Sequence, residues 1–182
     1  NRVGVPLMLF QLNNLHEAAV IEIATNQPGE ISMLAEMANP THGVITNISK
    51  EHLEQLMDIR GVELEETSLF GQLKKSGFAL INIDDEILQK YTKIIERSFT
   101  FGRTPKADIS GNINLNDELK PTISLKFFND KLKVEPDVIG LPSALNTIAA
   151  AATAYAVDPD LDMIKNGLRK YKNDEITKYG RM

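Results

Sequence analysis

The sequence contains no cysteine, no tryptophan and no phosphate loop of the form Gly-x-x-x-x-Gly-Lys-Ser/Thr. The absence of cysteine excludes disulfide bonds and thiolate metal sites, and it is compatible with a reducing compartment. A nucleoside triphosphate site built only from these residues would lack the backbone cradle that usually holds the phosphates. No apolar run approaches the roughly 20 residues that a membrane-spanning helix needs, so we expect no membrane span.

The bulk composition is that of a globular domain. A chain of 182 residues with 42% hydrophobic content can bury a sizeable core as one domain. The net charge is -5 and the lysines and arginines are scattered, so nothing favours binding to nucleic acid or to a membrane surface.

Strand and helix patterns alternate through the first part of the chain. We expect strands at residues 18–23, 43–48, 78–83 and 98–101, and helices at residues 28–38, 50–56, 62–75 and 84–95. Such alternation predicts parallel strands joined by right-handed helical crossovers.

The second part predicts a hairpin followed by two helices. Strands at residues 122–128 and 131–138 flank a turn at Asn129-Asp130, and helices are expected at residues 143–157 and 160–171. The predicted fold is therefore α/β, with three layers and a mostly parallel sheet flanked by helices, and with an antiparallel hairpin at one edge. We expect one domain over residues 1–172 and a polar linker over residues 173–182.

Glu22 is the first candidate site residue, because it lies near the end of an apolar run that we expect to be a strand buried on both faces. One interpretation is a metal-binding or proton-transfer role at the carboxyl end of a parallel strand, where α/β sheets place their ligands. The alternative is a glutamate that is hydrogen-bonded to a neighbouring loop.

Asn47 and His52 follow the next expected strand, with His52 in the first turn of a helix. If the two strands are neighbours, His52 and Glu22 lie at the same edge of the sheet. An imidazole and a carboxylate there could hold a divalent cation and leave positions for phosphate oxygens and water. The alternative is a histidine that caps or packs in a turn.

Other polar residues have simpler interpretations. Asn146 lies in the alanine-rich helix, where its amide needs either a backbone partner or a ligand. Asp84 follows the third strand, and we expect it to cap the next helix. His16 and His42 precede strands, and both are expected at the surface.

Several segments, taken in order, resemble the central domain of the Mur ligase family. The most similar branch adds D-alanyl-D-alanine to UDP-N-acetylmuramoyl-tripeptide. Residues 1–7 (NRVGVPL) resemble its Asn-x-x-Gly-Val-Pro-Leu, and residues 22–31 (EIATNQPGEI) resemble its Glu-Met-Gly-Ala-Asn-His-x-Gly-Glu-Ile, which is serine-rich in other branches. Further similarities are VITNI and HLE at residues 44–48 and 52–54, NID at 82–84, FG at 101–102 and GRM at 180–182. The resemblance therefore covers the chain.

The resemblance implies a P-loop-like domain of a three-domain cytoplasmic ligase. ATP phosphorylates the carboxylate of a UDP-MurNAc-peptide, and the amine of D-Ala-D-Ala attacks the acyl phosphate to form an amide. Carried over, Glu22 and His52 are Mg²⁺ ligands, and Asn47 lies close to the phosphate and acyl-phosphate region. Asn146 contacts adenine, and Arg181 approaches the nucleotide from the domain junction. A cation suits this step because negative charge develops on the transferring phosphoryl group.

The sequence also departs from the family pattern. The family's phosphate loop precedes the segment that resembles residues 1–7, so we expect a longer polypeptide and an isolated chain that does not hydrolyse ATP. Relatives carry a carbamylated lysine as a Mg²⁺ ligand, and an ungapped alignment places Glu66 there and Ser68 at a following glutamate. Glu66 keeps a carboxylate but reaches roughly 4 Å less far, and Glu65 could compete for its role.

In the segment that resembles Gly-x-His-Asn-x-x-Asn, residues 140–146 (GLPSALN), Asn146 is the only polar family residue that is kept. Two alternatives to a D-Ala-D-Ala-adding ligase therefore stay open. One is a catalytically diverged homologue that serves binding or assembly, and the other is a related ligase with a different acceptor.

Overall fold

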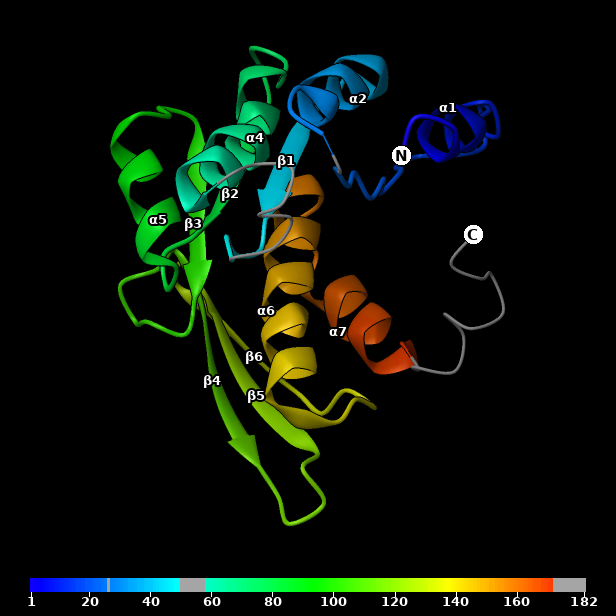
Figure 1. The fold of residues 1–182 in the computed structure, drawn as a ribbon. Helices are drawn as coiled ribbons and strands as arrows, with labels where there is room; N and C mark the ends of the chain where they lie inside the picture. Colours follow the sequence, from blue (N-terminus) through cyan, green and yellow to red (C-terminus); the bar gives the residue numbers. More distant parts are fainter. Residues whose placement is uncertain (26, 50–57, 172–182) are drawn as a thin grey trace. The chain divides into compact units, whose positions relative to one another are not determined.

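The computed structural model describes residues 1–25, 27–49 and 58–171, and Figure 1 labels their helices and strands. The strands are β1 (His42–Ile45), β2 (Phe78–Asn82), β3 (Ser98–Gly102), β4 (Ile109–Leu115), β5 (Pro121–Phe127) and β6 (Asp130–Val134). They are hydrogen-bonded in the order β1-β2-β3-β4-β5-β6 as one mostly parallel sheet with antiparallel pairs at one end. The predicted α/β class with flanking helices and an antiparallel hairpin at one edge is confirmed.

The helices are α1 (Gly4–Leu9), α2 (Glu30–Ala38), α4 (Ile59–Gly71), α5 (Glu86–Gln89), the 3-10 helix η1 (Lys90–Lys93), α6 (Gly140–Val157) and α7 (Leu161–Lys170). Helix α4 begins earlier than expected because the Asp58 carboxylate accepts a hydrogen bond from the Gly61 backbone N–H at 2.8 Å. The helix expected at residues 50–56 lies outside the described residues. Within the described ranges, no helix is both long and apolar enough to cross a membrane.

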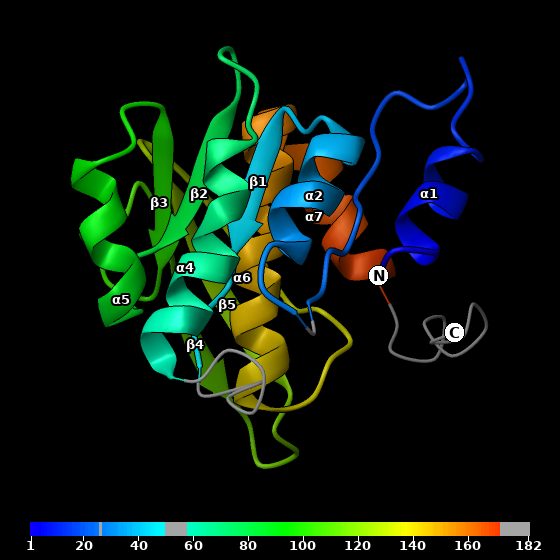
Figure 2. The same ribbon diagram turned by 45° about the horizontal axis from the view of Figure 1, so that its top comes forward.

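The chain divides into two compact units, Asn1–Ala79 and Leu80–Met182. In the first unit α4 packs against both β1 and α2 (Figure 2). Ile31, Leu34 and Val62 are buried there. Gly43 permits a close approach of α4 to β1, because a Cβ atom at this position would lie 3.2 Å from Leu69 Cγ. This packing fixes the face that α4 turns towards β1.

The strand expected at residues 18–23 does not form, and this prediction was wrong. Val20 is 88% exposed, and the segment has no regular secondary structure. A strand is stable only when its backbone groups pair with a neighbour. β1 is the terminal strand of the described sheet, and residues 18–23 do not pair with it. Apolar β-branched composition is not sufficient without that partner.

The second unit contains a strand that the sequence patterns did not predict, β4. It pairs in parallel with β3 over a short stretch, where Phe101 faces Ile109 and Gly102 faces Ser110. β4 therefore begins beside the end of β3, so that a short loop replaces the usual helical crossover. β4, β5 and β6 continue as an antiparallel meander, which extends past β3 in Figure 1.

The hairpin register differs by one residue from the expected one. Phe127 pairs with Asp130, so Phe128 and Asn129 form the turn rather than Asn129-Asp130. Phe128 has a φ of 49°, which is unusual for a bulky residue. Its ring contacts Phe99 and Tyr155, with centroids 5.7 Å and 5.9 Å away. These aromatic contacts favour the strained turn over the Asn-Asp turn that local propensity predicts.

The alanine-rich helix α6 packs on β3, β4 and β5, as its small residues predict (Figure 1). Ala144, Ala151 and Ala152 are fully buried, and they let the helix axis approach the sheet closely. A Cβ atom at Gly111 of β4 would lie 2.5 Å from Ile148 Cγ1 and Cδ1. Glycine at this position therefore makes the room that Ile148 occupies.

Candidate functional site

Glu22 is exposed and lies outside any strand, so it does not stand at the buried strand end that the sequence predicts. Asn47 is placed more nearly as expected. β1 ends at Ile45, earlier than predicted, and Asn47 lies just beyond its carboxyl end, after Thr46. The Asn47 side chain is exposed, and its Oδ1 atom accepts a hydrogen bond from the Thr46 hydroxyl at 3.3 Å.

Glu66 lies on the side of α4 that faces β1. Val62, Glu66 and Leu69 are spaced at helical i, i+4, i+7 intervals and share one stripe. Val62 is buried, Leu69 packs on β1 at Gly43, and Glu66 between them is half-buried. The helical spacing thus directs the Glu66 side chain towards the sheet, as its expected role as a Mg²⁺ ligand requires.

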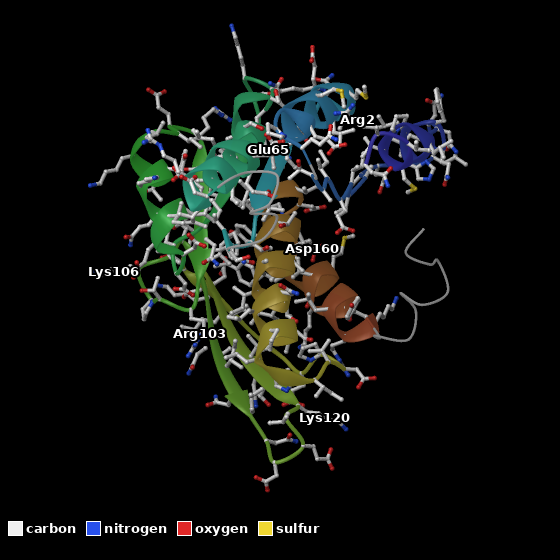
Figure 3. The ribbon with its side chains drawn as sticks, viewed as in Figure 1. Arg2, Glu65, Arg103, Lys106, Lys120 and Asp160 are labelled. Carbon is white, nitrogen blue, oxygen red and sulfur yellow. The ribbon has the colours of Figure 1, made fainter. Side chains whose placement is uncertain are left out.

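Glu65 could compete with Glu66 for the role of the family's lysine on sequence grounds, but its contacts differ from that expectation. It is only 6% exposed, and its carboxylate accepts hydrogen bonds from Gly29 N at 2.6 Å and from Ile31 N at 2.8 Å. It also accepts a hydrogen bond from the Thr25 hydroxyl at 3.2 Å. Figure 3 shows Glu65 where α4 and the start of α2 meet. Its carboxylate is therefore committed to the chain that follows Glu22.

A second ionic contact holds the same segment from the N-terminal side. Arg2 Nε donates to Glu30 Oε1 at 3.2 Å, and Arg2 Nη2 lies 3.4 Å from Gln27 Oε1. Glu30 is buried although it is charged, and an arginine partner reduces the cost of that burial. Residues 27–31, which distinguish the branch in the sequence, are thus anchored by Arg2 on one side and by Glu65 on the other.

In the second unit, two of the sequence motifs contact each other. Asp84 of the NID motif accepts hydrogen bonds from the backbone N–H groups of Arg103 at 2.5 Å and Thr104 at 3.1 Å. These residues directly follow the FG motif, and a Cβ atom at Gly102 would lie 2.9 Å from the Asp84 carboxylate. The expectation that Asp84 caps α5 was wrong. Asp85 does so instead, accepting from the N–H groups of residues 87 and 88.

The remaining candidates are placed as follows. Asn146 lies in the first half of α6 with its side chain exposed, so it is accessible to a ligand rather than buried among alanines. His16 is exposed as expected, whereas His42 is half-buried and stacks on Phe78 at 6.0 Å. His52 and Arg181, together with Asn26 of the branch-selective motif, lie outside the described residues.

A magnesium site needs several oxygen or nitrogen donors that converge on one point. Over residues 1–25, 27–49 and 58–171, no group of three histidine, cysteine, aspartate or glutamate side chains is arranged to hold a metal ion. The carboxylates of Glu22 and Glu66 are suitable oxygen donors for Mg²⁺, but two carboxylates do not complete a site. The third expected ligand, His52, is not described, so the metal site stays a prediction.

Comparison with known proteins gives a consistent family. The model of the Mur ligase middle domain matches residues 1–154. The UDP-N-acetylmuramoyl-tripeptide–D-alanyl-D-alanine ligase of Buchnera aphidicola subsp. Baizongia pistaciae is 28% identical over 171 residues, covering 92% of this chain and 37% of the relative. The ligase of the same name from Escherichia coli K12 is 28% identical over 176 residues, covering 94% and 39%. The chain thus spans less than two fifths of the length of these relatives.

A solved structure also shares the fold. The crystal structure of MurF from Acinetobacter baumannii superposes with a TM-score of 0.87 at 24% identity, over 95% of this chain and 38% of that one. At this identity the likeness establishes the fold alone.

Proposed function

Because the chain belongs to the Mur ligase family through its middle domain, we propose that it is the ATP-binding part of a ligase that adds D-Ala-D-Ala to a UDP-MurNAc-peptide. The observation that carries this proposal is the match to ligases of that name over more than nine tenths of the chain. The protein would act in the cytoplasm, in the synthesis of the peptidoglycan precursor.

The proposed reaction has two steps. The peptide carboxylate attacks the γ-phosphorus of ATP, which gives an acyl phosphate and ADP. The amine of D-Ala-D-Ala then attacks the acyl carbon and gives up one proton to solvent. The amide bond forms, and inorganic phosphate leaves with the electrons of the broken C–O bond. Mg²⁺ would neutralise the charge that develops on the transferring phosphoryl group. We assign Glu22 and His52 as its ligands.

The chain's own residues have distinct proposed roles. Asn47, exposed at the carboxyl end of β1, can donate its amide N–H groups to phosphoryl oxygens. Glu66 takes the place of the family's carbamylated lysine on α4. Asn146 offers an accessible amide to the adenine edge from α6, and Arg181 offers a cation to the nucleotide.

One set of observations supports the catalytically diverged alternative. Glu66 is shorter than the lysine that it replaces, and the exposed Glu22 lies outside a strand. The polar residues of the adenine segment are reduced to Asn146. A protein with these changes could keep the fold for binding or assembly without ligating.

The deciding experiment is an assay of the intact protein with UDP-MurNAc-tripeptide, D-Ala-D-Ala, ATP and Mg²⁺. We expect an amide product by mass spectrometry and one phosphate released for each amide formed. A product that forms only with a different acceptor would favour the related ligase. Absence of product with every acceptor, from a folded protein, would refute the ligase proposal and favour the non-catalytic one.

A further inference from the structure

Helix α2 has no side-chain cap of its own. Its N-cap residue is Gly29, which has a φ of 81°, and no side chain of the cap accepts a hydrogen bond from the first turn. Backbone N–H groups in the first turn of a helix need acceptors, and a negative charge stabilises that end of the helix. Glu65, distant in sequence and carried by α4, supplies both through its contacts with Gly29 and Ile31.

This arrangement has a consequence for ligand binding. The N-terminus of a helix is a common binding site for phosphate. At α2 the N–H groups of the N-cap residue Gly29 and of Ile31 already donate to a buried carboxylate of the same chain, and the N–H of Glu30 donates to the Gln27 carbonyl. These N–H groups at the start of α2 therefore serve an internal anchor and are not available to a nucleotide phosphate.

The anchor joins the two segments that carry candidate site residues. Glu65 is the chain neighbour of Glu66, and Thr25, whose hydroxyl donates to Glu65, follows Glu22 closely. A second link lies further along α4, where Gln72 Nε2 donates to Ser32 Oγ at 2.9 Å. With two links, α4 can neither slide nor rotate on α2 without breaking one of these hydrogen bonds.

We propose that Glu65 is a positioning residue of the phosphoryl-transfer site. By tying the start of α2 to α4, its carboxylate fixes the direction of Glu66 and the path of the chain that leaves Glu22. This inference rests on the proposed function, because it assigns Glu66 a role in that reaction. Glu65 itself touches no reactant, since its oxygens accept from Thr25, Gly29 and Ile31.

The test compares three variants of the intact protein. Glu65→Gln keeps the shape of the side chain but loses the charge and one acceptor, and Glu65→Ala removes the anchor. Glu36→Gln is the matched control, because it removes the same charge from an exposed position of α2. Carbodiimide-driven labelling of the Glu66 carboxyl group, quantified by mass spectrometry, reports its placement without any ligand. Steady-state kinetics report the reaction.

We expect Glu65→Gln to raise the labelling rate of Glu66 and the amide exchange rates of Gly29 and Ile31 by about tenfold. We also expect kcat to fall by about tenfold or more while the KM for D-Ala-D-Ala stays within about twofold. The control should behave as the unmodified protein. Glu65→Ala should show larger changes of the same sign, and thermal unfolding identifies it if it fails to fold, in which case Glu65→Gln decides.

Two results would overturn the proposal. The first is unchanged Glu66 labelling in Glu65→Gln. The second is raised amide exchange with an unchanged kcat, which would make Glu65 a structural cap only. An unmodified protein that forms no amide would instead refute the proposed function, and the labelling of Glu66 would still decide whether Glu65 positions it.

Discussion

Replacing Gly111 with alanine tests how closely α6 packs on the sheet. The added methyl group would lie 2.5 Å from two carbons of Ile148 and 3.4 Å from Leu125 Cδ2. Carbon atoms attract each other best at about 3.5–4.0 Å, so Ile148 must move by about 1 Å. Ile148 is only 1% exposed, so it cannot move out into solvent to make room. Overpacking of this kind costs about 1–3 kcal/mol, and removal of a strand glycine returns about 0.5–1 kcal/mol.

The partner variant Ile148→Ala should cost about 3 kcal/mol through the cavity that it leaves. The double variant is informative because the methyl group at position 111 enters that cavity and no longer meets Ile148. We expect it to be more stable than the sum of the single effects predicts, by about 1–2 kcal/mol.

Urea denaturation followed by far-ultraviolet circular dichroism gives the free energy of unfolding of all four proteins. If the two single effects add to within about 0.5 kcal/mol, Gly111 and Ile148 do not contact each other and the packing of α6 described above is wrong.

Three further predictions concern the anchors and the chain itself. Gly29→Ala should lower stability by about 1–2 kcal/mol through its positive φ alone. Gly167→Ala, in helix α7 with open space around it, should instead raise stability by about 0.5–1 kcal/mol. Thermal unfolding measures both changes, and two stability changes of the same sign would contradict the argument. Asp84→Asn should speed amide exchange at Arg103 and Thr104 by about tenfold, whereas Glu86→Gln, at an exposed position, should leave these rates unchanged. Equal exchange rates in the two variants would mean that Asp84 does not hold these two N–H groups. The isolated chain should release no phosphate from ATP and Mg²⁺ above a buffer control in a colorimetric phosphate assay, and release that scales with the chain would refute this.

The local patterns of the sequence predicted helices α2, α4, α6 and α7, and the β5–β6 hairpin with its turn one residue too late. They did not predict α1, and the helix expected at residues 84–95 is instead the short helix α5 followed by η1. Amphipathic spacing and small residues suffice for α6 and α7, because the signal lies within the segment itself. The same logic failed for residues 18–23, whose β-branched residues found no pairing partner. β4 was missed because residues 109–115 (ISGNINL) interleave apolar residues with serine, glycine and asparagine, so their strand state depends on β3 and β5.

In the candidate site, too, some features follow from the local sequence and others depend on distant residues. The resemblance located Glu66 on α4, and helical spacing alone places it beside Val62 and Leu69. The sequence offered Glu65 and Glu66 as neighbouring carboxylates with no local reason to separate them. Their roles differ because Glu65 meets Gly29 and Ile31, residues far away in the sequence. Likewise, Asp84 and Asp85 are both good capping residues, and the distant loop after β3 decides which one caps α5.

The staggered pairing of β3 with β4 has a consequence for the order of folding. Every strand contact from β3 to β6 joins residues that are close in the sequence, because β4 starts beside the end of β3 and hairpins connect the rest. Short loops close quickly, and regions rich in local contacts form fastest. β1 and β2, in contrast, are separated in the sequence by the whole of α4, so their pairing must close a longer loop. We therefore expect residues 98–134 to gain amide protection first during refolding, and to provide the surface on which the helices then dock.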